Sequence, residues 1–230
     1  MIRFPPLVEA EFIRRPNRFV VEVSLNGEPV IAHLHDPGRL RELLVPGATL
    51  FLAGAGSAKR KTWYDVILVK KGSQLVAIYS TLANRLVGGL LFEGRFPGLR
   101  SWRLLKTEPA FGNHRFDFEL IRGGKNMYIE VKSVSLVEKG TALFPDAPTV
   151  RGRKHLLALA EATRQGYQAT VVFVVTRRDA SCFRPHEKQD PNFSGALQHA
   201  TKQNVRVVAF KCKVKKDSMS IDSEIPLFLD

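Results

Sequence analysis

The sequence has few cysteines and no long apolar run. Only two cysteines, Cys182 and Cys212, occur among its 230 residues. Their wide separation fits neither a zinc-finger spacing nor a disulfide framework, so we expect two free thiols in a cytoplasmic protein. No stretch reaches the about 18 uninterrupted apolar residues of a membrane helix, and the start, MIRFPPLVEAEF, has no apolar signal-peptide core. We therefore expect neither a membrane protein nor a disulfide-rich secreted one.

Negative charge is also scarce. Lys and Arg number 35 against 22 Asp and Glu, which gives a formal net charge of +13. Hydrophobic residues make up 44% of the chain, a proportion typical of a packed globular protein and not of a disordered polyelectrolyte. The excess of positive charge favours a polyanionic partner, most simply nucleic acid, with an acidic membrane surface as the weaker alternative.

Two familiar ligand-binding patterns are missing as well. Gly54-Ala55-Gly56 lacks the Lys-Ser/Thr pair that completes a P-loop, so we expect no nucleotide-phosphate loop. His33 and His35 share one face of a predicted strand, but the sequence offers no evident third ligand. We expect these two histidines to be ordinary hydrogen-bonded side chains.

The first eighty residues predict a small barrel. Asn26-Gly27 is a two-residue hairpin turn, and the segment HDPGRLRELLVPG predicts a short helix that begins at Asp36 and ends at Pro46-Gly47. Strand–strand–strand–helix–strand–strand is the order of a five-stranded OB-type barrel, a fold that often binds oligonucleotides. The strands are expected at 7–14, 18–25, 29–34, 49–52, 66–69 and 74–80.

The rest of the chain predicts an α/β (α+β) domain with a mixed sheet. The run TVVFVVT at 170–176 is apolar and β-branched throughout, as in a strand buried on both faces. The segment 82–96 has helical spacing that Gly88-Gly89 weakens, and we place the domain boundary there, giving domains 1–82 and 83–230. Further strands are expected at 104–108, 115–122, 127–136 and 205–214, and helices at 150–165 and 195–203.

One hairpin carries three residues with catalytic potential. Glu130 and Lys132 are two apart on a strand and therefore share a face. A hairpin that turns at Gly123-Gly124 pairs Asp117 directly with Glu130, with Cβ atoms about 4.5–5.5 Å apart. Two carboxylates at this distance repel each other unless a cation lies between them. An acid-x-lysine pair also occurs by chance on exposed strands, so the alternative is an idle surface pair.

The chemistry of these three side chains suits phosphodiester hydrolysis. Mg²⁺ (or Mn²⁺) prefers oxygen ligands and takes one or two carboxylates together with water and substrate phosphate. Asp117 and Glu130 would hold this ion, which neutralises charge that builds on a phosphodiester. Lys132 would position or help to deprotonate the attacking water.

Several longer blocks resemble a known family. Asp…Glu-x-Lys on a hairpin, followed by a helix and a buried strand, is similar to the PD-(D/E)XK nuclease superfamily. More closely, the chain resembles the sugar fermentation stimulation protein A family, from near residue 1 to about Val214. It departs at His35-Asp36-Pro37, where many members have Pro-Asn-Thr. The blocks that carry the resemblance are KRK at 59–61, ANRL at 83–86, RFDF at 115–118, YIEVKSVSL at 128–136 and FPDAPTVRGRKHL at 144–156.

The resemblance implies an OB-fold domain, a restriction-endonuclease-like domain, DNA binding and a link to the regulation of sugar fermentation. The superfamily motif falls on Asp117, Glu130 and Lys132, and Glu108 matches the place of an additional acid in many such nucleases. The implied partner is DNA, bound with little sequence specificity.

Two basic clusters are candidates for nucleic-acid contact. One lies in a barrel loop, where cations stand beside an aromatic ring that can stack on a base. The other opens the helix after the hairpin, where a helix N-terminus favours phosphate. The lysines at 211–216 are expected instead to form a solvated sheet edge. The candidate residues are Lys59, Arg60, Lys61 and Trp63 in the loop, and Arg151, Arg153, Lys154 and His155 on the helix.

Three functions therefore stay open from the sequence. The first is a Mg²⁺-dependent DNA nuclease, and the second is a DNA-binding regulator that keeps the nuclease scaffold without turnover. An RNA-binding module fits the barrel and the positive charge equally well.

Overall fold

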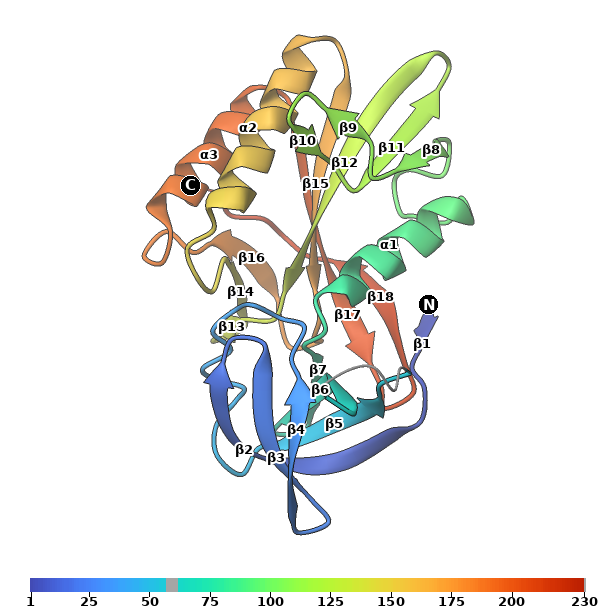
Figure 1. Cartoon of the computed structure of the whole chain (residues 1–230). Helices are drawn as coiled ribbons and strands as arrows, with labels where there is room; N and C mark the ends of the chain where they lie inside the picture. Colours follow the sequence, from blue (N-terminus) through green and yellow to red (C-terminus); the bar gives the residue numbers. More distant parts are fainter. Residues whose placement is uncertain (57–61, 230) are drawn as a thin grey trace.

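The structure is a computed structural model that describes residues 1–56 and 62–229 (Figure 1). A β-barrel forms one end of the molecule, and a mixed sheet with helices on both faces forms the other. The predicted nucleic-acid ligands Lys59, Arg60 and Lys61 lie outside the described residues. None of the described helices is long and apolar enough to cross a membrane.

The barrel is the predicted OB-type fold. Its strands pair in the order β4-β3-β2-β5-β6-β7, and a parallel pairing of β4 with β6 closes the sheet on itself. Small and branched apolar side chains such as Val21, Val23 and Leu52 fill the interior. The strands are β2 (Leu7–Asn17), β3 (Val20–Leu25), β4 (Glu28–His33), β5 (Thr49–Gly54), β6 (Tyr64–Lys71) and β7 (Gln74–Ala77).

The helix predicted between Asp36 and Pro46 does not form. Leu40 has φ of +51°, which a right-handed helix excludes, and Arg15 hydrogen-bonds the carbonyls of Asp36 and Gly38 at 3.1 and 2.6 Å. A Cβ at Gly38 would lie 2.4 Å from Asp146 of the second domain. The helical prediction was wrong because these tertiary contacts fix the segment as a loop.

The second domain is built on a seven-stranded sheet in the order β1-β18-β17-β15-β12-β11-β8. Parallel strands β12, β15 and β17 form its centre, as the apolar run at 168–175 requires. The strands are β1 (Ile2–Arg3), β8 (Arg103–Thr107), β11 (Phe118–Arg122), β12 (Lys125–Val134), β15 (Gln168–Val175), β17 (Arg206–Val214) and β18 (Ser218–Glu224).

Two features of this sheet differ from the prediction. The strand β18 pairs with β17, so the lysines of 211–216 do not form a free sheet edge. The chain's first strand, β1, pairs with β18 and therefore belongs to the second domain's sheet rather than to the barrel (Figure 1). The β1 pairing joins segments that are far apart in the chain, whereas β18 follows β17 after a short turn at residues 215–217.

Three helices cover the sheet. Helices α2 (Val150–Arg164) and α3 (Pro191–Lys202) pack on one face and α1 (Thr81–Phe92) on the other (Figure 1). Gly88 of the glycine pair in α1 has a packing reason, because a Cβ there would meet the Phe118 ring at 3.0 Å. Short strands complete the domain: β9 (Ala110–Phe111), β10 (His114–Arg115), β13 (Val137–Glu138), β14 (Thr141–Phe144) and β16 (Cys182–Pro185).

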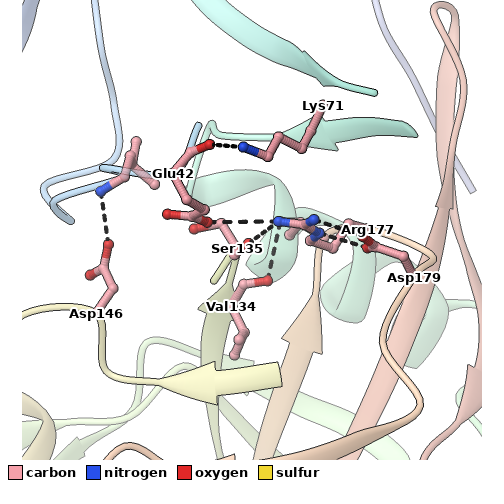
Figure 2. A network of polar contacts seen from close by, with 9 residues as sticks. Glu42, Lys71, Val134, Ser135, Asp146, Arg177 and Asp179 are labelled. Carbon is pink, nitrogen blue, oxygen red and sulfur yellow. Dashed lines mark hydrogen bonds and ion pairs between the residues drawn. The ribbon is translucent and has the colours of Figure 1, made fainter. Parts of the chain in front are cut away.

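The two halves share one core and one buried polar network. Barrel residues such as Phe51 and Leu68 pack in the same apolar cluster as α1 and the far face of β12. Arg177, whose side chain is 4% exposed, donates two hydrogen bonds of 2.6 and 2.7 Å to Asp179 and one of 3.1 Å to the Ser135 carbonyl (Figure 2). Its guanidinium also lies 3.7 Å from Glu42 of the barrel loop. The barrel and the sheet are therefore held together by both apolar and ionic contacts.

Candidate metal centre on the hairpin

The hairpin between β11 and β12 has the predicted register. Phe118 pairs with Ile129 and Arg122 with Lys125, so the turn lies at Gly123-Gly124. Asp117 comes directly before the first paired residue of β11, and its amide donates to the Ile129 carbonyl at 3.1 Å. The strand predicted over 115–122 is interrupted at Phe116 and Asp117, which lie between β10 and β11.

Asp117 is fixed by both neighbouring elements. Its Oδ1 accepts from Asn84 of α1 at 2.6 Å, and its Oδ2 accepts from the amide of Val131 at 2.6 Å. Burial, and after it the nearby charge of Glu130, raise the pKa of Asp117 to about 6 despite these hydrogen bonds, which favour the charged form. The sequence did not single out Asn84, whose only signal was its place in the ANRL block.

Glu130 is the most enclosed acid of the hairpin, with a side chain that is 3% exposed. Its Oε1 contacts both the Lys132 ammonium and Nδ1 of His155, a residue of α2. Burial raises the pKa of Glu130, but the hydrogen bond from His155 and the charge of Lys132 outweigh it and keep the pKa below its usual range. Within the described chain its Oε2 is buried and has no hydrogen-bond partner.

This arrangement fits a hard divalent cation. An unsatisfied buried carboxylate oxygen is costly, and a metal ion is one of the few partners that removes the cost. The donor set of two carboxylates is that of Mg²⁺ or Mn²⁺ sites, which complete their shells with water and phosphate. Asp117 and Glu130 are the residues that would hold the ion.

Glu108 lies apart from the buried acids. Its side chain is 73% exposed and pairs with Arg115 at 3.4 Å, while its amide donates to the Asp117 carbonyl at 2.9 Å. Glu108, Asp117 and Asn84 nevertheless line one open pocket of about 600 Å³. The structure brings Glu108 to the mouth of the site rather than into the cluster around Glu130.

A larger groove of about 1480 Å³ runs beside α2. Arg151 and Lys154 line it, whereas Arg153 is not among its lining residues. His155 lines the groove too, but it is buried and its ring is engaged with Glu130, so it links the groove to the acid. The sequence missed Arg115 and Arg164, whose side chains join the same groove from β10 and from the end of α2.

The barrel contributes two further observations. Trp63, the described member of the predicted loop cluster, is 69% exposed. The expectation that His33 and His35 lack a third ligand was wrong, because Asp65 brings a carboxylate oxygen close to both rings. Asp65 lies thirty-two residues after His33, and only the closing pair of β4 and β6 brings them together, which no local pattern reveals.

The fold and the Asp…Glu-x-Lys hairpin together define a class of proteins in which an OB-type barrel is followed by a nuclease-like domain. Family sequence profiles identify the family within this class. The profile of the sugar fermentation stimulation protein RE domain matches residues 81–218, and that of the SfsA N-terminal OB domain matches residues 13–78. The chain belongs to the sugar fermentation stimulation protein family.

Individual relatives match between 95% and 100% of the chain. The sugar fermentation stimulation protein homolog of Clostridium kluyveri is 42% identical over 231 residues, covering 100% of both chains. That of Desulfitobacterium hafniense is 43% identical over 218 residues, covering 95% of this chain and 94% of the relative. A solved structure of Pyrococcus furiosus SfsA in complex with Ca²⁺ superposes with a TM-score of 0.87 at 27% identity, covering 99% of this chain and 98% of that one.

Proposed function

We propose that this protein is a Mg²⁺-dependent DNA nuclease that hydrolyses phosphodiester bonds at the hairpin. The observation that carries the proposal is the environment of Glu130, a buried carboxylate. Lys132 and His155 contact one of its oxygens, and no hydrogen-bond partner from residues 1–56 and 62–229 reaches the other. A binding protein has no need of such a carboxylate next to a second acid. We propose in addition a link to the regulation of sugar fermentation, on the ground of family membership. We also propose a cytoplasmic location, on the ground of the low cysteine content.

Each side chain of the cluster has a proposed role. Asp117 and Glu130 bind the ion, which supplies charge neutralisation at the phosphate and a lower pKa for the attacking water when it is bound. Lys132 keeps its ammonium against Glu130, where it can orient that water or the scissile phosphate. His155 is a positioning residue, because its contact with Oε1 fixes the rotamer of Glu130.

The groove beside α2 is the proposed path of the DNA backbone. Arg151 and Lys154 are exposed on its wall, and Arg115 adds a third cation from the opposite side. Contacts of this kind read phosphate and not base edges, which supports binding with little sequence specificity. His155 lines the groove and contacts Glu130, so the groove is linked to the acid cluster through the His155 ring.

The barrel is the proposed second nucleic-acid contact, with a domain boundary near residue 82. The exposed Trp63 ring offers a stacking surface, and the Lys59, Arg60 and Lys61 cations precede it in the chain. The Ca²⁺ complex of the Pyrococcus furiosus relative supports a divalent ion in this family, since Ca²⁺ and Mg²⁺ both prefer oxygen ligands.

The test is cleavage of end-labelled single- and double-stranded DNA in Mg²⁺, Mn²⁺ or EDTA. We expect cutting by the wild type in either metal and none in EDTA. The variants Asp117→Ala and Lys132→Ala should lose at least about 100–1000-fold in rate, the scale for removing one preorganised electrostatic contact at a reacting phosphate. Both variants should still bind DNA, because the groove lies on α2.

Lys125→Ala is the matched control, since Lys125 is an exposed lysine at the other end of β12. It should cut DNA at the wild-type rate. A purified wild type that binds DNA but cuts neither form in any metal would leave the regulator without turnover as the better description. Preferential binding of RNA would favour the RNA-binding module.

A further inference from the structure

A second cluster of metal-ligand side chains lies where the barrel closes. His33 ends β4 and Asp65 lies in β6, and these two residues are direct partners in the parallel pairing that closes the barrel. His35 follows two residues after His33, and its ring stacks on Tyr79 at 3.9 Å. The cluster is therefore built on the seam of the barrel and not on a loop tip.

The three ligand atoms converge on one point. Nδ1 of His33 lies 2.9 Å from Nε2 of His35, and Nε2 of His35 lies 3.0 Å from Oδ1 of Asp65. The third side of the triangle, from His33 Nδ1 to Asp65 Oδ1, is 3.6 Å. A tetrahedral zinc ion with bonds of about 2.0–2.1 Å has ligand atoms about 3.3 Å apart. The mean side of the observed triangle is close to that value.

We propose that His33, His35 and Asp65 bind a borderline transition-metal ion, with Zn²⁺ as the expected occupant. This site is separate from the magnesium site proposed on the hairpin. Two imidazoles and one carboxylate form a donor set that suits Zn²⁺ better than Mg²⁺, which prefers oxygen alone. The three side chains are 29%, 21% and 13% exposed, which leaves a fourth position for water or another ligand.

Proton counting supports a cation at this point. Nε2 of His35 faces both Nδ1 of His33 and Oδ1 of Asp65, and a neutral imidazole nitrogen is either a donor or an acceptor. If it accepts from His33, its lone pair faces the carboxylate; if it donates, one proton is shared between two acceptors. A metal ion satisfies all three atoms at once through their lone pairs.

The position of the site indicates a structural role. The His35 carbonyl accepts a hydrogen bond of 2.8 Å from the Ser80 hydroxyl, directly before α1. Helix α1 carries Asn84, which binds Asp117 of the hairpin. An ion held by His33, His35 and Asp65 would tie β4, β6 and the start of α1 together. We therefore expect Zn²⁺ to raise the melting temperature of the full chain.

The experiment replaces Zn²⁺ by Co²⁺, whose tetrahedral complexes have intense visible absorption bands. The full chain is stripped with chelator, titrated with Co²⁺, and then with Zn²⁺ to displace it. We expect one Co²⁺ per chain with tetrahedral bands in the wild type. The variants His35→Asn and Asp65→Asn should weaken binding by more than the about 10–100-fold that changes around metal ligands cost.

Controls separate this site from the hairpin and from chance binding. Asp117→Asn should keep the tetrahedral bands, since it removes only the proposed magnesium ligand. His199→Asn, at an exposed histidine of α3, should keep them too. Circular dichroism of the metal-free variants shows whether each is folded. If one of His35→Asn and Asp65→Asn is unfolded, the Co²⁺ titration of the other tests the proposal. Absent tetrahedral bands in the wild type, or equal bands in His35→Asn and Asp65→Asn, would overturn the proposal, whether or not the protein cuts DNA.

Discussion

The hairpin cluster and the barrel cluster gather their ligands in different ways. On the hairpin, Glu130 is 3% exposed and its Oε1 contacts both Lys132 and His155. At the barrel seam, His33 and His35 are 29% and 21% exposed and offer ring nitrogens as ligand atoms. The first environment suits a hard ion that must also face a phosphate, and the second suits an ion with a structural role.

The difference also lies in what each cluster is built on. Glu130 lies on a strand that is flanked on both sides, by β11 and β15, so its backbone cannot shift without disturbing the sheet. His33 and Asp65 instead lie on the last pairing to close a barrel. The proposed catalytic acid Glu130 therefore lies on an interior strand of the sheet, whereas the proposed structural ion joins the two strands that close the barrel.

The largest expected effect is on stability, and it tests whether the barrel and the second domain unfold as one cooperative unit. Arg177→Ala leaves Asp179 and Glu42 without their buried cation and should cost about 3–5 kcal/mol of unfolding free energy. The measurement is denaturant unfolding followed by both far-UV circular dichroism and Trp fluorescence. Arg178→Ala is the matched control, because its pair with Asp222 is exposed and should contribute less than about 1 kcal/mol.

The Arg177 contact also has a predicted pH dependence. Its hydrogen bonds lower the pKa of Asp179. A lowered pKa in the folded state means that the stabilisation is fully present above the ordinary Asp pKa of about 3.9 and is lost as pH falls through the lower folded value. The stability difference between wild type and Arg177→Ala should shrink in that acid range. A difference that grew on acidification would contradict this role for Arg177.

The next effect concerns the balance of charge at Glu130. His155→Ala leaves Oε1 of a buried carboxylate with one polar partner in place of two, which should cost about 1–3 kcal/mol of stability. Because His155 orients the proposed metal ligand Glu130, Mn²⁺ affinity should fall about 10–100-fold. His114→Ala is the control, since His114 lines the same groove without contacting Glu130 through any described hydrogen bond. Equal Mn²⁺ affinity in wild type and His155→Ala would show that Glu130 needs no support from α2.

A smaller effect tests the groove beside α2. The double variant Arg151→Ala, Lys154→Ala should bind duplex DNA more weakly, and its slope of log affinity against log salt should fall by about 0.9 for each phosphate that the protein no longer neutralises. Replacing Lys202 and Lys213, exposed lysines outside the groove, should leave the slope unchanged. An unchanged slope in both double variants would show that the DNA backbone does not contact Arg151 and Lys154 of α2.

The smallest expected effect is that of cysteine alkylation on Co²⁺ binding, and it tests whether a thiol takes part in the barrel site. Cys212 is fully buried, and burial raises the pKa of its thiol to about 12, so it should resist alkylation in the folded protein. Cys182 is partly exposed and should react. Alkylated protein should bind Co²⁺ as the wild type does, since His33, His35 and Asp65 carry no sulfur. Disappearance of the cobalt bands after alkylation of Cys182 alone would contradict this ligand set.

The hairpin could be predicted from the sequence because the residues that determine its register are close together in the chain. The turn at Gly123-Gly124 fixes the register, and the register fixes which residues face each other. The prediction of a free lysine edge at 211–216 was wrong because β18 follows β17 after a short turn at residues 215–217 and pairs with it. The prediction of a helix at 36–46 was wrong because contacts with the distant residues Arg15 and Asp146 outweigh the local pattern.

The candidate site was only partly visible for the same reason. Asp117, Glu130 and Lys132 form a spacing that can be found in the sequence. The contacts that give the site its character come from other elements, His155 from α2 and Asn84 from α1. Asp65 beside His33 depends on barrel closure, which no window of the sequence contains.

The most direct test of the central claim is binding of Mn²⁺ to the hairpin acids, measured by electron paramagnetic resonance of the free ion. The barrel site is first filled with Zn²⁺, and the wild type, Asp117→Asn and Glu130→Gln are then titrated in parallel. We predict Mn²⁺ binding by the wild type and at least about a 100-fold weaker affinity in each variant, more than a change around the ligands costs. Equal Mn²⁺ binding by all three proteins would contradict the assignment of Asp117 and Glu130 as metal ligands.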